Sequence, residues 1–487
     1  MKVHLVGICG SGMSQLARLF REAGHEVRGS DVSFDPPSGP ELERLGIHMY
    51  KGYAAENLAW SPDTVVVGNA IRRDNPEAVA VAERASRGEV TSLGMSEALR
   101  THFLSGRRAV IAAGTHGKTT TSSLLAHLLL RADLEPGYFI GGAPKDLPGG
   151  AAIGRTKAVL TSGSLKKSPF VIEGDEYDAV YWKKEPKFLD YVGVSADDVV
   201  ILTSIEHDHI DIYPNKEAYL AAFEKLARAV PAGGMLVCAA HDPEVRAIAK
   251  SCAGRVVYYA LDRDDCGDIT PTWLGATAPI DDAGIQSFDL FAGGVSAGRF
   301  SMRIPGEHNV RNAIAAIAAL TEGFQVPFST IRAGLATFTG VRRRQDLLGE
   351  PGGVRVYDDF AHHPTAVNET LRALRNKHRS GKLFAVFEPR SATACRALHQ
   401  AEYPKSFDAA DVVMFAPLGR TTIPEGERLD LPRLANDLGP KARVTSGVDE
   451  IVSALQASAK PGDTIAILSN GAFGNIYDKL LRSLGGS

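Results

Sequence analysis

Residues 110–121 have the sequence VIAAGTHGKTTT, and this segment restricts the fold more than any other part of the chain. The apolar run 109–113 predicts a buried strand, and residues 120–130 predict an amphipathic helix. A sharp glycine turn between a strand and a helix can cradle phosphate, because glycine lets backbone N–H groups approach phosphate oxygens. Ala112 stands where the strict G-x-x-x-x-G-K-T pattern has its first glycine. The alternative is a chance glycine turn, and the segment alone predicts a nucleoside triphosphate site and nothing narrower.

The residues of this loop have separate expected tasks. Gly117 allows close backbone approach, Lys118 can reach the β- and γ-phosphates, and the Thr119 hydroxyl can bind Mg²⁺. The predicted triphosphate-binding residues are Gly114, Thr115, His116, Gly117, Lys118, Thr119 and Thr120.

Length and composition limit the class of protein. The chain has 487 residues, which predicts about three domains, and its formal net charge of −3 gives no reason to expect a nucleic-acid or membrane partner. Five scattered cysteines without C-x-x-C spacing argue against a disulfide framework and a structural zinc site, and they predict a reducing compartment. The first residues lack a signal-peptide pattern, and no run of 18 apolar residues occurs, so we expect a cytoplasmic location.

Short apolar runs alternate with helical patterns along the chain, which predicts an α/β fold with parallel sheets. We expect three domains, over residues 1–104, 105–325 and 326–487. The expected strands are 3–7, 26–29, 64–67, 109–113, 170–172, 199–203, 354–357, 383–387, 411–415 and 464–468. The expected helices are 13–23, 77–87, 120–130, 309–323 and 474–484.

Two segments of the central region depart from this alternation. Residues 287–304 alternate apolar and polar around a Gly-Gly pair and predict an antiparallel hairpin. Residues 141–169 are rich in Gly, Pro, Ser and Lys and predict a surface loop that is mobile at 161–168.

A second glycine turn, GICGSG at residues 7–12, follows the first expected strand. It resembles G-x-G-x-x-G with Cys9 at the middle glycine, and Asp31 ends the next strand, where an acid can bind a ribose hydroxyl. The pattern fits a nicotinamide or flavin dinucleotide, the diphosphate of another nucleotide, or a turn without a ligand. The candidate ligand-binding residues here are Gly7, Cys9, Gly10, Ser11, Gly12 and Asp31.

Acids and histidines follow the expected strands of the central region. Residues 173–178 (EGDEYD) are placed to hold Mg²⁺, and residues 206–211 (EHDHID) suggest a second cation site with mixed ligands. The alternatives are a solvated charged loop for the first group and, for at least half of the second, capping of the next helix.

Further polar groups lie toward the C-terminus. Residues 306–312 (GEHNVRN) could contact an adenine, although an N-cap with a solvated first turn is favoured from the residues alone. The basic cluster 342–344 could clamp phosphate or cover a surface. Residues 358–364 (DDFAHHP) predict a binding site at a strand end, and Arg390 could bind a carboxylate.

In this order, GTHGKT at 114–119, the acids at 173–178, DHID at 208–211, GEHN at 306–309 and DFAHHP at 359–364 resemble the Mur ligase family of ATP-dependent peptidoglycan amide-bond ligases. The resemblance covers all three expected domains. It implies a Rossmann-like N-terminal domain for the UDP-sugar, a central ATPase domain and a Rossmann-like C-terminal domain that brings the incoming amine. The N-terminal turn then resembles a UDP-diphosphate site and not a nicotinamide site.

The resemblance implies ATP and Mg²⁺ as cofactors and a role for each candidate residue. The implied catalytic residues are Lys118, Glu173, His209 and Arg344, and the implied metal ligands are Thr119, Glu173 and His209. The implied further ATP contacts are His308, Asn309 and Asn312 near the adenine, Asp359 at the ribose, and Arg343 and Arg344 at the phosphates. The implied substrate-binding residues of the C-terminal domain are His362, His363 and Arg390. Many relatives carry a carbamylated lysine whose position falls near residues 223–225, where the sequence alone assigns no carbamate.

Finer details resemble those members that join L-alanyl-γ-D-glutamyl-meso-diaminopimelate to UDP-N-acetylmuramate during peptidoglycan recycling. These details include GIC at 7–9, IEGDEYD at 172–178 and EPRS at 388–391. The first alternative is the member that adds L-alanine to UDP-N-acetylmuramate, and the second is a regulatory ATPase of the same fold without ligase activity. The expected partners are these small molecules, and the expected assembly is a monomer or a weak homodimer.

Overall fold

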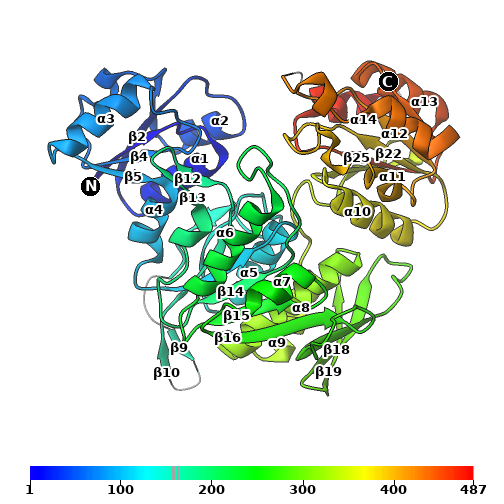
Figure 1. The fold of residues 1–487 in the computed structure, drawn as a ribbon, viewed down its shortest axis with the longest axis horizontal. Coiled ribbons are helices and arrows are strands. Elements are labelled where there is room, and N and C mark those ends of the chain that lie inside the picture. Colours follow the sequence, from blue (N-terminus) through cyan, green and yellow to red (C-terminus); the bar gives the residue numbers. More distant parts are fainter. Residues whose placement is uncertain (156–158, 162–163, 421, 486–487) are drawn as a thin grey trace.

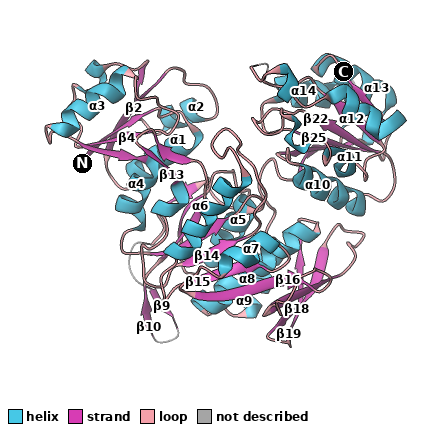
Figure 2. Ribbon diagram, in the orientation of Figure 1, coloured by secondary structure: helices cyan, strands magenta, loops and turns pink. Residues whose placement is uncertain are grey.

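The computed structural model describes residues 1–155, 159–161, 164–420 and 422–485. It contains three α/β units, with the N-terminal and C-terminal units on the same side of the central unit in the view of Figure 1. In Figure 2 helices flank the main sheet of each unit, and the strand pairs β9–β10 (Val159–Thr161 and Ser164–Lys166) and β18–β19 (Gln286–Ala292 and Val295–Met302) project from the central unit. The predicted α/β class and three-unit organisation are therefore confirmed.

The N-terminal unit is built on a five-stranded parallel sheet in the order β3-β2-β1-β4-β5. The sequence predicted β1, β2 and β4 and missed β3 and β5, which are short and only partly buried. Its strands are Lys2–Val6, Glu26–Asp31, His48–Lys51, Thr64–Val67 and Thr91–Gly94 (β1–β5). Its helices are Ser11–Glu22, Ser38–Arg44, Pro76–Ser86 and Met95–Leu99 (α1–α4), followed by a π-helical turn at Arg100–Leu104.

The central unit contains a ten-stranded mixed sheet in the order β19-β18-β17-β16-β15-β14-β6-β11-β7-β8. The predicted hairpin is present as β18 and β19, which pair antiparallel across Gly293 and Gly294. The sheet strands are Arg108–Ala113 (β6), Gly137–Phe139 (β7), Ala151–Ala152 (β8), Pro169–Glu173 (β11), Val199–Leu202 (β14), Met235–Ala239 (β15), Arg255–Leu261 (β16), Trp273–Thr277 (β17), Gln286–Ala292 (β18) and Val295–Met302 (β19). Its helices are Lys118–Arg131 (α5), Lys216–Ala229 (α6), Pro243–Ala249 (α7), Glu307–Phe324 (α8) and Phe328–Thr337 (α9).

The C-terminal unit has a six-stranded sheet in the order β20-β21-β25-β22-β23-β24, parallel except for β20. Its strands are Asp346–Gly349 (β20), Arg355–Asp359 (β21), Leu383–Phe387 (β22), Val412–Phe415 (β23), Ala442–Val444 (β24) and Thr464–Leu468 (β25). Its helices are Pro364–Lys377 (α10), Tyr403–Ser406 (α11), Leu431–Leu438 (α12), Val448–Ser458 (α13) and Ile476–Gly485 (α14).

The prediction of a surface loop at 141–169 is wrong in part. Strand β8 pairs with β7 and contacts helix α1, and Leu147 and Ala151 are buried. Two further strands, Val159–Thr161 (β9) and Ser164–Lys166 (β10), form an antiparallel pair. The predicted mobility at 161–168 falls partly on residues 162–163, which lie outside the described residues.

Helix α9 lies within the segment 326–487 that was predicted to form the third domain. It packs against α5 and β19, and its Ile331 and Leu335 are buried in the apolar core of the central unit. This helix therefore lies with the central unit.

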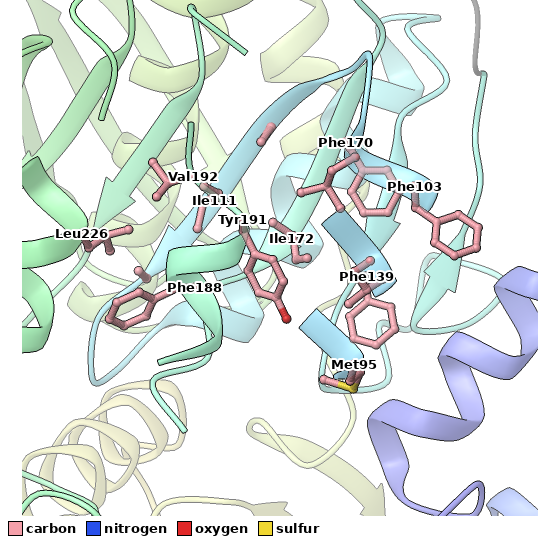
Figure 3. Close-up of a cluster of buried hydrophobic side chains, with 14 of the residues drawn as sticks. Met95, Phe103, Ile111, Phe139, Phe170, Ile172, Phe188, Tyr191, Val192 and Leu226 are labelled. Atoms are coloured by element: carbon pink, nitrogen blue, oxygen red, sulfur yellow. The ribbon is translucent and has the colours of Figure 1, made fainter. Parts of the chain in front are cut away.

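The N-terminal and central units share one apolar core. Met95 and Phe103 of the first unit lie in the same buried cluster as Phe139, Phe170 and Ile172 of the central sheet (Figure 3). The C-terminal unit has two apolar core clusters of its own. Among the described residues, the buried side chains of both clusters all come from residue 354 onward, so this unit shares no buried core with the other two.

Candidate active site

The glycine turn predicted at residues 114–119 joins β6 to α5, and the helix begins at Lys118, two residues earlier than predicted. Gly114 and Gly117 have φ values of +126° and +83°, a region that favours glycine. A Cβ atom on Gly117 would lie 2.5 Å from the Asn312 side-chain oxygen, so any larger residue here would displace that side chain. The loop therefore brings α8 close to the start of α5.

Lys118 lies at the N-terminus of α5, and its ammonium group is held by the loop itself. The Nζ atom donates to the carbonyls of Gly114, at 2.6 Å, and Thr115, at 3.1 Å. It also forms an ion pair at 2.9 Å with Oε1 of Glu176. His209 Nε2 lies 2.9 Å from the same carboxylate oxygen, so one buried acid joins the phosphate loop to the histidine of the second acidic cluster.

Thr119 and Glu173 are in direct contact. The Thr119 hydroxyl donates to Glu173 Oε1 at 2.7 Å, and the Gly141 N–H donates to Oε2 at the same distance. Burial raises the pKa of the Glu173 carboxyl above its ordinary value, against the hydrogen bond from Thr119 and the charge of Lys118. A cation beside this carboxylate would favour its charged form.

The donor set around these residues fits Mg²⁺. The magnesium site has two parts: Thr119 and Glu173 offer oxygen ligands in one, and Glu176 and His209 offer an oxygen and a nitrogen in the other. The second oxygen of Glu176, Oε2, is buried without a hydrogen-bond partner among the described residues, which is costly unless a ligand satisfies it. His209 adopts a positive φ of +55°, a conformation rare for this residue, in the turn that presents its ring to Glu176.

Glu176 is a site residue that the sequence interpretation did not single out. It lies in the predicted acidic run 173–178, but the sequence does not tell which of four acids points inward. In the structure Asp175 pairs with Lys187 and Asp178 with Lys184. Glu176 is left as the buried acid between Lys118 and His209.

The alternative that residues 206–211 mainly cap the next helix is wrong. Helix α6 is capped by Asn215, whose side chain accepts from the Ala218 N–H. Glu206 instead contacts His116 of the phosphate loop, at 2.8 Å. Burial alone would raise the pKa of Asp208, but the charges of His209, His362 and His363 lower it below its ordinary value.

The start of helix α8 does not have the solvated first turn favoured from the residues alone. Asn309 and Asn312 are each 6% exposed, and the Asn309 amide donates to the Pro305 carbonyl at 2.7 Å. His308 Nδ1 lies 3.1 Å from Glu369 of α10. Asn312 faces Gly117, so the start of this helix borders the phosphate loop. This position is compatible with adenine binding, and the adenine contacts stay a prediction.

Arg343 and Arg344 of the basic cluster 342–344 have different contacts. Arg343 binds Asp358 at 3.1 Å and donates to the carbonyls of Ser469 and Gly471, so its guanidinium braces the C-terminal unit. The Arg344 guanidinium lies 5.1 Å from the centre of the Phe360 ring, beside the strand end of β21. Their predicted phosphate contacts stay predictions.

The residues after β21 meet the central unit. Asp359 is buried and accepts from the N–H groups of Gln345, at 2.7 Å, and Ala361, at 2.8 Å. His362 Nε2 lies 3.8 Å from Asp208 Oδ2, and His363 Nδ1 lies 3.3 Å from Glu206 Oε2. The strand end predicted to bind ligands therefore faces the phosphate loop and the second acidic cluster.

A cavity of about 320 Å³ opens beside His209, between the central and C-terminal units. Arg390, predicted as a carboxylate ligand, lines it and is 47% exposed. Sequence reasoning missed Arg420, which approaches the cavity from a loop without a local motif, and gave no role to Asn470, although the segment 469–474 (SNGAFG) resembles the family. The other lining residues are Tyr177, Asp211, Ser391, Ala392, Thr393 and Gly419.

The N-terminal glycine turn is held by Asp31. Its carboxylate accepts from the Cys9 N–H at 2.8 Å and from the Tyr53 hydroxyl at 3.3 Å. Burial, with the charge of Asp31, raises the pKa of the Cys9 thiol to about 11. The residues Gly7, Gly10, Ser11 and Gly12 lie in this turn and at the start of α1, and their predicted nucleotide contacts stay predictions.

Lys225, in the segment where relatives carry a carbamylated lysine, lies away from this site. Its ammonium group pairs with Glu185 at 3.1 Å, and its side chain is 59% exposed. All five cysteines are free. Among the described residues, no helix is long and apolar enough to cross a membrane.

Three family models match successive parts of the chain. The catalytic domain of the Mur ligase family matches residues 2–100, the Mur ligase middle domain matches 112–320, and the glutamate ligase domain of Mur ligases matches 343–471. The fold and the nucleotide-binding loop thus belong to an ATP-dependent amide ligase. The chain is a member of the Mur ligase family.

Relatives with two different activities are similar over most of the chain. The UDP-N-acetylmuramate–L-alanyl-γ-D-glutamyl-meso-2,6-diaminoheptandioate ligase of Escherichia coli is 34% identical over 99% of this chain and 98% of its own length. The UDP-N-acetylmuramate–L-alanine ligase of Kineococcus radiotolerans is 41% identical over 85% of this chain and 80% of its own length. The crystal structure of a murein peptide ligase from Psychrobacter arcticus superposes with a TM-score of 0.70 at 31% identity, covering 100% of this chain and 99% of that one.

Proposed function

We propose that this ligase joins L-alanyl-γ-D-glutamyl-meso-diaminopimelate to the carboxylate of UDP-N-acetylmuramate, with ATP and Mg²⁺, in a cytoplasmic recycling reaction. The observation that carries the proposal is the cavity beside His209, which is lined by Arg390, Arg420 and Asn470. Guanidinium groups bind carboxylates. The tripeptide carries three carboxylates and free L-alanine carries one, so two arginines in a cavity of about 320 Å³ favour the larger donor.

The proposed reaction has two chemical steps, phosphorylation of the muramoyl carboxylate and attack by the amine. The muramoyl carboxylate oxygen attacks the γ-phosphorus of ATP, and the bond to the β-phosphate oxygen breaks to release ADP and leave an acyl phosphate. The neutral amine of the peptide then attacks the acyl carbon, the carbon–oxygen bond to phosphate breaks, and the nitrogen loses a proton. Phosphoryl transfer of this kind depends on alignment and charge neutralisation.

Different residues of the site would provide alignment and charge neutralisation. Lys118, released from the carbonyls of its own loop, would turn to the β- and γ-phosphates. One Mg²⁺ held by Thr119 and Glu173, and a second held by Glu176 and His209, would neutralise phosphate charge. Asn309 and Asn312 would border the adenine, and Asp359 the ribose.

The remaining predicted roles follow the same division of the chain. The N-terminal unit would bind the UDP-sugar at residues 7–12, the central unit, which includes α9, would bind ATP, and the C-terminal unit would bring the amine with His362, His363 and Arg390. Arg344 would reach the phosphates from the C-terminal unit. Close docking of that unit excludes water, which would otherwise hydrolyse the acyl phosphate.

A single-turnover comparison of amine donors tests the proposal. With UDP-N-acetylmuramate and ATP, the tripeptide should support ADP release far better than L-alanine at equal concentration. Preference for L-alanine would assign the chain to the biosynthetic alternative. ADP release that depends on neither substrate would support the alternative of a regulatory ATPase.

Variants of the cavity test the same point by a second route. Arg390→Ala and Arg420→Ala should each raise KM for the tripeptide about tenfold or more, because a charge-assisted hydrogen bond is worth roughly 1.5–3 kcal/mol. Arg396→Ala is the matched control, since Arg396 pairs with Glu427 and does not line the cavity. Unchanged KM in both cavity variants would remove the arginines from donor binding.

A further inference from the structure

Three side chains with metal-ligating atoms meet where the C-terminal unit contacts the phosphate loop. His116 lies in the loop, Glu206 follows β14, and His363 is the N-cap residue of α10. His116 Nε2 is 2.8 Å and His363 Nδ1 is 3.3 Å from Glu206 Oε2, and one ligand atom from each residue lies within 4.8 Å of the others.

We propose that His116, Glu206 and His363 form a site for a divalent transition-metal ion of the Zn²⁺ type, separate from the magnesium site. Two imidazoles and one carboxylate are a ligand set that zinc uses with a fourth position left for water. Ligands at 2.0–2.1 Å around a tetrahedral ion lie about 3.3 Å apart. The observed spacing therefore needs only small side-chain adjustments to receive the ion.

The ligand set differs from that of the magnesium site. The magnesium site offers mainly oxygen atoms, which suit a hard cation. The proposed site offers two imidazoles, which suit zinc, copper and nickel. The two sites should therefore select different ions.

His363 is held at the cluster with little freedom to move away. Its side chain is only 4% exposed, and the Nδ1 atom that faces Glu206 also accepts a long hydrogen bond of 3.4 Å from the Thr365 N–H, which an ion would replace. Burial, together with the nearby charge of His116, keeps the pKa of His363 well below its ordinary value, so the ring is neutral. A neutral imidazole is the form that binds a metal ion.

The carboxylate is also in its ligating form. Burial alone would raise the pKa of Glu206, but the hydrogen bond and charge of His116 and the charge of His363 lower it to about 2. The side chains of His116 and Glu206 are 25% and 37% exposed. An ion and its bound water can therefore reach this cluster from solvent.

The three proposed ligands come from two units, so ion binding would affect how these units dock. His116 and Glu206 belong to the central unit and His363 to the C-terminal unit. An ion bound by all three stabilises the docked arrangement, because undocking would remove one ligand. The site thus makes domain docking sensitive to transition-metal concentration.

The test uses Co²⁺ as a visible probe, with the full chain in excess Mg²⁺ so that the oxygen-rich site is filled. One equivalent of Co²⁺ should give the intense visible bands of a four- or five-coordinate site, and Zn²⁺ should displace it. We expect Co²⁺ binding to weaken by about 10- to 100-fold or more in each of three variants: Glu206→Gln, His116→Asn and His363→Asn. Loss of an outer-shell partner of a metal ligand already weakens binding by this factor. Asn at residue 363 retains a side chain that can cap α10.

Two control variants separate this site from its neighbours. His399→Gln should keep the Co²⁺ bands, because His399 packs edge-on against His363 with ring centres 4.6 Å apart but is not part of the cluster. His209→Asn should also keep them, because it alters the magnesium site. Loss of the bands in His209→Asn with retention in Glu206→Gln would place the ion at the magnesium site and overturn the proposal.

Small-angle scattering provides the second measurement. Zn²⁺ should make wild-type protein more compact in solution and should have no effect on Glu206→Gln. Circular dichroism of each variant shows whether it is folded before binding is compared. Absence of Co²⁺ bands in folded wild-type protein, or equal compaction of wild type and Glu206→Gln, would contradict the proposal.

Discussion

The two junctions of the central unit differ in chemistry. The junction with the N-terminal unit is apolar, since Met95 and Phe103 share a buried core with Phe139 and Phe170. Burial of aromatic and aliphatic side chains is the main stabilising term in folding. The first two units are therefore expected to behave as one rigid body.

The junction with the C-terminal unit is mostly polar. It includes the ion pairs of Lys145 with Asp346 and of His308 with Glu369, and the contact of His363 with Glu206. Polar junctions of this kind permit relative domain motion. The candidate active site lies at this polar junction, where docking and undocking can admit ATP and release products.

The largest expected effect concerns the apolar junction. Phe170→Ala should lower the free energy of unfolding by about 3–5 kcal/mol, because it removes a fully buried ring from a shared core. Hydrogen exchange should rise in both α4 and β11. Phe387→Ala, in the separate core of the C-terminal unit, is the matched variant and should raise exchange in that unit alone.

Lys118→Ala tests whether the chemistry lies at the polar junction. Ligation should fall by about 10²-fold or more, since the ammonium group supplies electrostatic stabilisation. Lys225→Ala is the control, because Lys225 is surface-exposed and pairs with Glu185. Near-normal turnover in Lys118→Ala, measured as ADP release, would remove the loop from catalysis.

The pair of His308 and Glu369 makes the polar junction dependent on pH. Burial would raise the pKa of Glu369, but the hydrogen bond and charge of His308 lower it to about 2. A depressed carboxyl pKa stabilises the docked form above the ordinary value near 4.5, and this contribution is lost as the pH falls through the lowered pKa of about 2. Scattering should show undocking over this range in wild type and a weaker pH response in Glu369→Gln.

The smallest expected effect is that of Lys145→Ala. Lys145 is 25% exposed, and the Asp346 carboxylate keeps its hydrogen bond from the Arg343 N–H when Lys145 is removed, so the loss should be about 1 kcal/mol. The unfolding free energy should change by no more than this, whereas docking should weaken measurably by scattering. A loss as large as that of Phe170→Ala would show that the two junctions do not differ as described.

Much of the fold could be predicted from local pattern. Strands β4, β22 and β25 were placed at their observed bounds, because fully buried parallel strands appear as short, continuous apolar runs. The short edge strands β3, β5 and β24 were missed, since they are partly exposed and their residues do not alternate clearly. Strand β8 was missed because two residues within a Gly-rich segment carry no periodicity.

The site was predictable where a motif supplies its own geometry. The glycine turn fixes Lys118 and Thr119 at the start of α5, so the position of the phosphate loop could be predicted from the sequence motif alone. Solvation of Asn309 and Asn312 was predicted wrongly, because burial at the start of α8 depends on Gly117 and not on neighbours in sequence.

The sequence by itself determined the α/β class, the phosphate loop and the order of acidic clusters, because these depend on apolar runs and on residues adjacent in the chain. Only the tertiary structure decided that Glu176, among four neighbouring acids, joins Lys118 to His209. Only the tertiary structure brought His363 to Glu206, 157 residues earlier in the chain by their numbers. Contacts at such separation depend on how two folded units dock, and local sequence carries no signal for docking.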